Sequence, residues 1–510
     1  MSMGAAPVEP RTPNLNCGES VDGLSQSNAS NYKCRKITRR ETEVETTIGV
    51  AAIGEIRANL KGDAFVPGDD GYEEARAAWN LNAHQNPALV VMAEGASDVL
   101  EAVRLARDEG LGVGVIATGH GVAAPADGGV LINTSRMKGV HVDPETQTAR
   151  VEAGAKWADL VPEAAAHGLA GLQGSTSQVG VVGYTMGGGF GWLGRKYGFA
   201  ADSVKEADVV TADGELVKVS AHENPDLFWG LKGGGGNFGI VTSLEFALYP
   251  ITHVYGGNLF YPAEKAEEVL DLYARWSGDL PDEVTSAATF LNIPPMPDIP
   301  EPLRGKSVIT MRFCYTGDDL EAKGAELLAP WRELGDPIMD TFGVMPCTMM
   351  DMISMDPVDP LGAYGHSEML HDLSAETRET LVKLAVADSP LIVLEMRQLG
   401  GALSRPPGDL NPMGRSDARY ILNGIGATFS PEMAQGVQAF LAYVAESVKP
   451  HASGAQYVNF MDLDGATPER VKASYTSEDW DRLVDLKDRR DPENIFRFNR
   501  NIPPAAVAAG

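Results

Sequence analysis

One histidine stands between two glycines where an apolar stretch ends. The segment LGVGVIATGHG, residues 111–121, places His120 after Gly119 and before Gly121. Because glycine permits sharp turns and close backbone approach, this imidazole is expected at a bend facing another group. Such a histidine can be a surface residue, a catalytic base, a metal ligand or a point of covalent attachment. The nine histidines show no HxH or HExxH spacing, which argues against a metal site.

A second segment of interest is GLQGSTSQVGVVGYTMGGGFGWLGRKYG, residues 171–198, which is dense in glycine. Its pattern fits neither helix nor strand, so it predicts a loop folded against something else. Backbone N–H groups in glycine-rich turns can hold phosphate oxygens without adding side-chain bulk. The segment is therefore a candidate for binding a phosphate-bearing cofactor.

A third glycine segment, GGGNFG at 234–239, satisfies the GxGxxG pattern, which alone is a weak signal. A dinucleotide-binding fold requires a strand before the glycines and a helix after them. The following residues, IVTSLEFALYP, are rich in β-branched and aromatic side chains and predict a strand. The motif therefore does not predict a Rossmann NAD site.

The elements around His120 read as a β-α-β unit. Residues 87–93 and 111–117 predict buried strands, and 97–110 predicts a helix with Ser97 as N-cap and Gly110 as its end. This unit delivers His120 to the carboxyl end of a strand, where α/β folds place ligands. A hairpin with Asp213-Gly214 at its turn follows. Beyond residue 251, Pro-rich connectors separate strands from amphipathic helices, which predicts an α+β region with an antiparallel sheet.

Composition narrows the class of protein. The 510 residues carry 42 Lys plus Arg against 70 Asp plus Glu, a net charge of −28, which disfavours binding to nucleic acid. No apolar run is long enough for a membrane helix, and the polar first 47 residues show no secretory signal. The four cysteines form no CxxC pair, so we expect a reduced, cytoplasmic protein.

The segment from ATGHG to GGGGNFGIVTSLEFALYP resembles the FAD-binding domain of the vanillyl-alcohol oxidase/PCMH superfamily. The C-terminal YVNFMDLDG and YTSEDWDRLVDLKDRRDPENIFRFNRNIPP resemble the closing element of berberine-bridge-enzyme-like oxidases. The resemblance implies an α+β fold: a two-lobe PCMH-type FAD-binding domain, and a substrate domain whose antiparallel sheet is covered by helices. We expect a mobile tail at 1–47, the FAD domain at 48–250, the substrate domain at 251–454 and the C-terminal element, returning to the flavin domain, at 455–510.

In that family the histidine of the glycine-rich pentapeptide is bonded to the 8α-methyl group of the flavin, and His120 occupies this position. Many members carry a second tether, a cysteine, where this chain has Thr176. The resemblance therefore implies FAD held by a single histidyl link. The other positions that match the family's cofactor sleeve are Thr118, Gly119, Gly121, Ser175, Ser177, Val179, Gly180, Gly183, Tyr184, Gly188, Gly189, Tyr197, Gly198, Ile240, Val241, Asn459 and Asn499.

Three further residues are candidates for the chemistry on the substrate. Removal of a hydride requires a base or polarising group beside the flavin. In LIVLEMRQLGG, strand alternation places Glu395 and Arg397 on one face. Three interpretations remain open: Glu395 is the base, the two residues pair and bind a polar group of the substrate, or they form only a structural salt bridge. Tyr457, expected on a strand with Asn459, matches a family tyrosine that can act as a tyrosinate. Its ordinary pKa of about 10 would have to be lowered by a cation, for which Arg397 is the candidate.

Together these observations predict an FAD-dependent oxidase of a small organic substrate: an alcohol, a sugar, an amine or a secondary metabolite. A hydride would pass to flavin N5, and molecular oxygen would be reduced to hydrogen peroxide. Val179 favours this reading, because the family's oxidases tend to have valine at this position. The alternatives are a dehydrogenase with another electron acceptor and a flavin-binding protein without catalysis. No metal, nucleic acid or membrane partner is expected.

Overall fold

The computed structural model describes residues 48–385, 389–405, 411–414, 417–461 and 463–508, all within one compact unit. The tail expected at 1–47 lies outside these residues. Helices and three sheets make up the fold, so the α+β class expected from the sequence is confirmed. Within the described ranges, no helix is both long and apolar enough to cross a bilayer.

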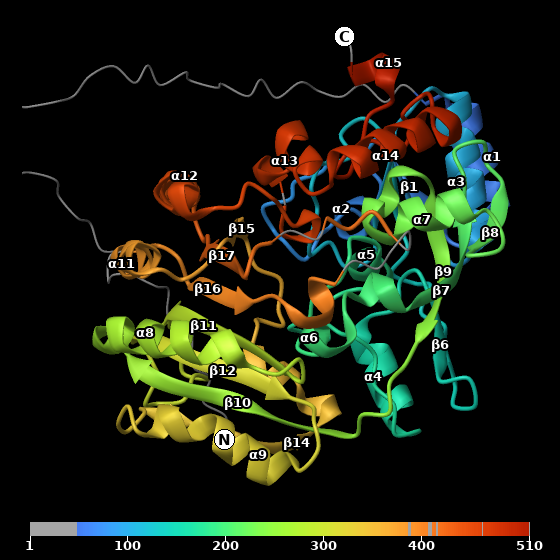
Figure 1. Ribbon diagram of the computed structural model, residues 1–510. Helices are drawn as coiled ribbons and strands as arrows, with labels where there is room; N and C mark the ends of the chain where they lie inside the picture. Colours follow the sequence, from blue (N-terminus) through green and yellow to red (C-terminus); the bar gives the residue numbers. More distant parts are fainter. Residues whose placement is uncertain (1–47, 386–388, 406–410, 415–416, 462, 509–510) are drawn as a thin grey trace, which may run out of the picture. The chain divides into compact units, whose positions relative to one another are not determined.

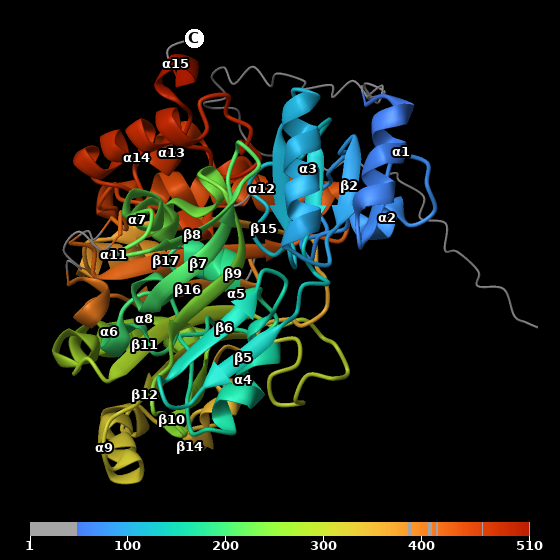
Figure 2. The same cartoon turned by 90° about the vertical axis from the view of Figure 1, so that its right-hand side faces the viewer.

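The first sheet has four strands in the order β1-β2-β4-β3 and lies beside helices α1 and α3 (Figures 1 and 2). Strands β2, β4 and β3 are parallel, as the β-α-β reading requires. Its elements are α1 (Val50–Asn59), β1 (Asp63–Phe65), α2 (Tyr72–Ala75), β2 (Leu89–Met92), α3 (Ala96–Asp108), β3 (Val113–Ile116) and β4 (Val130–Asn133).

Helix α3 shows how local sequence sets this region. Four apolar residues of its predicted face, from Val99 to Ala106, are fully buried, and Gly110 follows the helix with a φ of +68°. The expected N-cap, Ser97, is wrong, because the helix begins at Ala96 after Gly95. The carboxylate of Asp98 instead accepts hydrogen bonds from the backbone N–H groups of residues 61, 62 and 94. These bonds fix the chain that enters the helix.

The second sheet has five strands in the order β5-β6-β9-β7-β8, and every pairing in it is antiparallel. It includes the expected hairpin, β7 with β8. The strand expected after GGGNFG is confirmed as β9, and these glycines follow helix α7 rather than a strand. The elements are β5 (Val140–Asp143), β6 (Thr148–Glu152), α4 (Trp157–Ala165), α5 (Val181–Met186), α6 (Gly194–Tyr197), β7 (Val204–Val210), β8 (Leu216–Ser220), α7 (Pro225–Gly234) and β9 (Ile240–Ala247).

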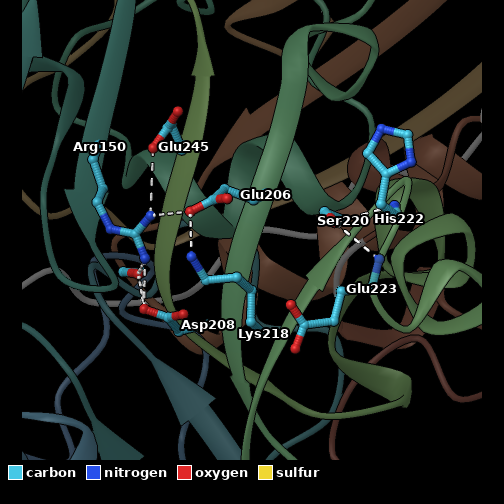
Figure 3. A network of polar contacts seen from close by, with 9 residues as sticks. Arg150, Glu206, Asp208, Lys218, Ser220, His222, Glu223 and Glu245 are labelled. Atoms are coloured by element: carbon cyan, nitrogen blue, oxygen red, sulfur yellow. Dashed lines mark hydrogen bonds and ion pairs between the residues drawn. The ribbon is translucent and has the colours of Figure 1, made fainter.

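One face of this sheet carries an ionic network centred on Arg150 (Figure 3). Its guanidinium group contacts Glu206 at 2.7 Å, Asp208 at 2.5 Å and Glu245 at 3.4 Å, and Lys218 reaches Glu206 at 3.1 Å. These side chains come from strands β6, β7, β8 and β9 and remain partly exposed. The network therefore links four strands across their solvent-facing side.

The third sheet has eight antiparallel strands in the order β13-β10-β12-β11-β16-β17-β15, with β14 also paired to β10. Helices α8, α9, α11 and α12 cover one face, as expected. The elements are β10 (His253–Pro262), α8 (Ala266–Trp276), β11 (Val284–Asn292), β12 (Ser307–Tyr315), α9 (Leu320–Arg332), β13 (Met339–Asp340), β14 (Gly343–Pro346), α10 (Asp351–Ser354), β15 (Ala363–Leu370), α11 (Ala375–Leu384), β16 (Val393–Gln398), β17 (Tyr420–Ala427) and α12 (Pro431–Val448).

Strand alternation divides the side chains of this sheet between two faces. Met311, Phe313 and Met396 point into the core beneath the helices. Their neighbours Arg312 and Arg397 therefore lie on the opposite face. That second face is the one that contacts the 171–198 segment. Arg195 of α6, for example, donates hydrogen bonds to the carbonyl groups of Val284 and Leu399.

The C-terminal segment packs back against the first half of the chain. Helix α14 packs on α7 (Figure 1), and the fully buried Lys487 donates hydrogen bonds to the carbonyl groups of Asn237 and Phe496. The carbonyl group of Ile495 accepts from Val113 at the start of β3. The helices are α13 (Pro468–Lys472), α14 (Ser477–Arg490) and α15 (Ala505–Ala508).

Candidate active site

The turn that carries His120 follows β3 directly. Gly119 has a φ of +75°, and a Cβ there would lie 2.5 Å from that of Ala78, so the turn requires glycine. The imidazole stacks on Trp79 with ring centroids 4.4 Å apart, and Nδ1 lies 2.9 Å from the Thr118 hydroxyl. The other ring nitrogen, Nε2, is buried and has no hydrogen-bond partner among the described residues. The His120 ring is thus held in one orientation, and one of its two nitrogens makes no hydrogen bond to a described residue.

Burial, with a smaller contribution from Lys156, lowers the pKa of His120 to about 4. The imidazole is therefore neutral at pH 7 and keeps a lone pair that can attack an electrophile. A base with so low a pKa is poorly matched to neutral pH. Among the described residues, no cluster of three or more His, Cys, Asp or Glu side chains could hold a metal ion. A neutral imidazole whose second ring nitrogen has no partner among the described residues is compatible with covalent attachment.

A cavity of about 610 Å³ opens beside this turn. It lies where β2, β3 and β4 end, which is the edge of the parallel sheet that usually receives ligands. Its lining includes Trp79, Thr118, His120, Lys156 and Pro360.

The glycine-rich segment is partly helical, because α5 and α6 interrupt the expected loop. Its glycines enclose the ring of Tyr184. Cβ atoms at Gly189 and Gly174 would lie 2.6 and 3.0 Å from that ring, and a Cβ at Gly191 would lie 3.2 Å from its hydroxyl oxygen. The Tyr184 hydroxyl is buried without a hydrogen-bond partner among the described residues, and burial raises its pKa well above the ordinary value. Tyr184 is therefore a neutral phenol packed closely against the backbone of these glycines.

Tyr457 does not lie on a strand, contrary to expectation. It precedes a short 3-10 turn, Val458–Phe460, because its carbonyl group accepts the Phe460 N–H at 3.0 Å. Its ring packs against Phe199 and Phe190, with centroid distances of 5.8 and 6.5 Å. The hydroxyl is buried and makes no hydrogen bond of ordinary geometry to a described residue, although the Asn459 side chain and the Gly189 backbone lie close enough to favour its ionised form. Within the same turn, Asn459 donates to the Tyr184 carbonyl group at 2.8 Å, which joins the two tyrosine segments.

The proposed lowering of the Tyr457 pKa is also wrong. Arg397 does act in that direction, but burial of the phenol dominates and raises the pKa. Tyr457 therefore remains protonated at neutral pH and presents a hydroxyl group, not a tyrosinate.

Glu395 and Arg397 lie on one strand face, as expected, within a buried ionic cluster. One carboxylate oxygen of Glu395 lies 2.6 Å from Nη2 of Arg397, and the other lies 2.7 Å from Nη2 of Arg312. Although burial opposes ionisation, these two guanidinium groups lower the pKa of Glu395. An ionised carboxylate with both oxygens occupied is a poor proton acceptor, so the structure does not support Glu395 as a free base.

The remaining sleeve positions occupy several settings. They include four glycines between His120 and Tyr457 in the sequence: Gly121, Gly180, Gly183 and Gly188. A Cβ on Gly183 would meet nothing within 4 Å, which is open space. Asn499 donates to the Phe496 and Gly236 carbonyl groups, and its Oδ1 is buried without a partner among the described residues.

Five expected sleeve residues are engaged elsewhere in the fold. The backbone N–H and hydroxyl of Ser177 both donate to Asp351, at 3.0 and 2.5 Å. The ring of Tyr197 packs on Tyr249, with centroids 4.1 Å apart. Ile240 and Val241 contribute side chains to two apolar cores. A Cβ on Gly198, whose φ is +94°, would meet the Asp202 carboxylate. Two further positions precede α5 in the chain. The Ser175 side chain lies beside Asp356, and the carbonyl group of Val179 accepts a hydrogen bond from the Trp157 N–H.

Sequence reasoning missed Trp79, Arg312 and Asp351. Arg312 did leave a signal, because it is the one charged residue in the otherwise uncharged strand SVITMRFCY. Trp79 and Asp351 gave none, since their contacts with His120 and Ser177 join distant parts of the chain.

The residues present fit a bound FAD. Buried polar atoms without a partner among the described residues include Nε2 of His120, the hydroxyls of Tyr184 and Tyr457, and Oδ1 of Asn499. Buried polar groups in folded proteins are nearly always hydrogen-bonded, so these atoms indicate a missing polar ligand. A flavin bearing ring carbonyl groups, hydroxyls and phosphates could satisfy them.

Two family profiles match the chain. The FAD binding domain matches residues 87–220, and the family described as berberine and berberine like matches residues 456–503. An FAD-linked oxidoreductase of Aspergillus terreus, pgmH, is 32% identical over 492 residues, covering 89% of this chain and 96% of the relative.

Solved structures are also similar. The crystal structure of 6-hydroxy-D-nicotine oxidase from Arthrobacter nicotinovorans has a TM-score of 0.74 and 26% identity, covering 87% of this chain and 98% of that one. Berberine bridge enzyme from Eschscholzia californica has a TM-score of 0.74 at 22% identity, covering 89% and 99%. At that identity the second likeness concerns the fold alone.

Proposed function

This chain belongs to the berberine-bridge-enzyme-like FAD-linked oxidoreductases, and on that premise we propose that it is an oxidase with a single covalent link from His120 to FAD. The observation that carries the proposal is the group of unpartnered buried atoms at His120, Tyr184, Tyr457 and Asn499. Bound FAD would supply the acceptor of a hydride, at its N5 atom, from an alcohol, a sugar, an amine or a secondary metabolite.

Several features support the covalent link. His120 is neutral at pH 7, its ring is held by Trp79 and Thr118, and Nε2 is the nitrogen without a partner. We therefore assign Nε2 the bond to the flavin 8α-methyl group. Thr176 stands where many relatives have a second, cysteinyl tether, which supports a single link.

The cofactor would be held by residues on both sides of this link. We propose residues 48–250 and 455–510 as the FAD-binding part and 251–454 as the substrate-binding part. The residues proposed to line the cofactor are Thr118, Gly119, Gly121, Ser175, Val179, Gly180, Gly183, Tyr184, Gly188, Gly189, Asn459 and Asn499. Ser177, Tyr197, Gly198, Ile240 and Val241 are left out, because their side chains or backbones are engaged elsewhere.

On the substrate side we assign different roles to three residues. Tyr457, with a protonated and unpartnered hydroxyl, would hydrogen-bond the substrate group that loses its proton. Arg397 would orient the substrate. Glu395 would position Arg397 through their hydrogen bonds at 2.6 and 2.8 Å and would not accept the proton.

We propose oxygen as the electron acceptor and hydrogen peroxide as its product. The support is Val179, since the family's oxidases tend to have valine at this position. Electron transfer to a non-oxygen acceptor is the alternative. Rapid mixing of anaerobically reduced protein with oxygen separates the two, because slow reoxidation would favour the dehydrogenase.

Acid precipitation followed by peptide mass spectrometry tests the covalent link. Yellow colour should remain in the pellet, with an FAD-sized mass on the peptide that contains His120. In His120→Asn the colour should move to the supernatant, whereas His222→Asn, at an exposed position, should behave like the unchanged protein. Release of flavin from the unchanged protein would refute the link, and a colourless protein would refute the oxidase.

A further inference from the structure

In the ionic cluster on the inner face of the eight-stranded sheet, one carboxylate forms direct ion pairs with two arginines. Arg312 and Arg397 provide two cations, whereas Glu395 provides one carboxylate. The side chains are 4%, 7% and 6% exposed, respectively. Because an uncompensated charge is strongly unfavourable when buried, this arrangement favours the arrival of an anion.

The donors of Arg312 are fully used within the protein. Its Nε and Nη2 donate to the hydroxyl of Thr289 at 3.0 and 2.7 Å, and Nη2 also contacts Glu395. Its Nη1 donates to the carbonyl group of Ser354 at 3.2 Å. Arg312 therefore holds Glu395 in place and has no N–H group available for a ligand.

Arg397 differs, because one nitrogen of its guanidinium group makes no hydrogen bond within the described part of the protein. Its Nε and Nη2 both contact one oxygen of Glu395, at 2.8 and 2.6 Å. Its Nη1 makes no hydrogen bond to any described residue. This nitrogen is also not fully buried, so it is accessible to a ligand. The rings of Phe190 and Trp192 support the guanidinium group, at 5.2 and 5.1 Å from their centroids. Nη1 is thus a cationic donor with a fixed orientation.

Other polar groups surround the same space. Phe190, which supports Arg397, also packs against Tyr457. Arg397 acts electrostatically on both Tyr457 and Tyr184, whose hydroxyls are unpartnered. Apart from Glu395, the nearby acid is Asp356, beside Ser175. Burial raises the pKa of Asp356, and among the described residues neither Arg312 nor Arg397 forms an ion pair with this carboxyl group.

We propose that Arg397 is the anchor for an anionic oxygen group of the substrate, most simply a carboxylate, bound through Nη1. The substrate is then an organic acid whose other end carries the carbon to be oxidised, beside Tyr457. This inference rests on the proposed function for that oxidation, but the anchor itself is a binding site that can be measured without turnover.

The test compares two ligands that differ in charge and little in shape, benzoate and benzamide. Their affinities for the purified holoprotein are measured by titration calorimetry and by perturbation of the flavin spectrum. We expect benzoate to bind at least about 10-fold more tightly than benzamide. Arg397→Gln should abolish this preference by weakening benzoate alone. Arg405→Gln, which removes an exposed arginine, is the matched control and should leave both affinities unchanged.

The outcomes are decisive in either direction. Equal affinities for the two ligands, no measurable binding of benzoate, or an unchanged preference in Arg397→Gln would each overturn the anchor. If Arg397→Gln does not fold, Arg397→Lys keeps the charge without the guanidinium geometry and should retain part of the preference. A colourless protein would contradict the proposed oxidase, yet calorimetry would still give the benzoate-to-benzamide ratio.

Discussion

Arg150 and Glu395 each lie at the centre of a network of opposite charges, but in different surroundings. Arg150 is about one-third exposed, at 31%, and contacts three carboxylates across the outer side of the five-stranded sheet (Figure 3). Glu395 is 6% exposed and contacts two arginines on the inner side of the eight-stranded sheet. Both networks join neighbouring strands, and both lower the pKa of a carboxyl group, Glu206 in one and Glu395 in the other.

The difference between the networks is what surrounds their charges. Water and salt screen the Arg150 network, so its pairs contribute little individually and its one excess carboxylate needs no further partner. Burial leaves each charge in the Glu395 network dependent on its neighbours, and an excess cation there must be used or compensated. An exposed network can therefore tolerate imbalance as a structural feature, whereas a buried imbalance indicates a ligand.

Arg312→Met should produce the largest loss of stability. It breaks one of the two ion pairs of Glu395 and removes the hydrogen bonds that Arg312 donates to Thr289 and Ser354, which together should lower the free energy of unfolding by about 3–5 kcal/mol. Urea or guanidinium denaturation of the variant and of the unchanged protein measures the difference. Arg405→Met, at an exposed ion pair, is the control. A loss below about 1 kcal/mol would mean that the buried network is no more important to stability than an exposed one.

Tyr457→Phe should separate function from stability. Its hydroxyl makes no hydrogen bond of ordinary geometry to a described residue, so removing it should leave the free energy of unfolding nearly unchanged. The rate of flavin reduction by substrate should nevertheless fall about 100-fold, because the hydrogen bond to the reacting group is lost. Stopped-flow absorbance under anaerobic conditions gives this rate. An unchanged rate would remove Tyr457 from the reaction.

The pKa of His120 predicts how flavin attachment depends on pH. Only the neutral imidazole can form the bond, and with a pKa of about 4 it is neutral above roughly pH 5. Attachment of FAD to flavin-free protein should therefore proceed at rates within about 2-fold of one another between pH 5 and 8. The rate is followed by the flavin retained after acid precipitation. A fall of about 30-fold from pH 8 to pH 5 would instead indicate an ordinary histidine pKa near 6.5.

Arg150→Met should have the smallest effect. The exposed network predicts a loss of about 1 kcal/mol or less in the free energy of unfolding. Because salt screens these charges, that loss should vanish near 1 M NaCl, whereas the loss caused by Arg312→Met should persist. Denaturation curves at low and high salt compare the two variants directly. A salt-independent effect at Arg150 would contradict the distinction between the networks.

The sequence determined much of the local structure around the site. The apolar strands and glycine turns predicted the β-α-β unit, the end of α3 at Gly110, the β7–β8 hairpin and the strand after GGGNFG. These features depend on residues close together in the chain, where period and backbone freedom are decisive. Alternation in the same way placed Glu395 and Arg397 on one face. The family resemblance and the α+β class followed from motifs of this kind.

Tertiary structure decided how the chemical groups behave. No local pattern reveals that Arg312, on another strand, holds Glu395 ionised, or that burial keeps Tyr457 protonated despite Arg397. The same holds for Trp79, which stacks on His120, and for the 3-10 turn at Tyr457 that replaced an expected strand. A pKa depends on solvent exclusion and on charges from distant segments, and neither exists until the chain has folded. The sequence therefore identified the candidate residues for the chemistry, and the fold assigned their charge states and partners.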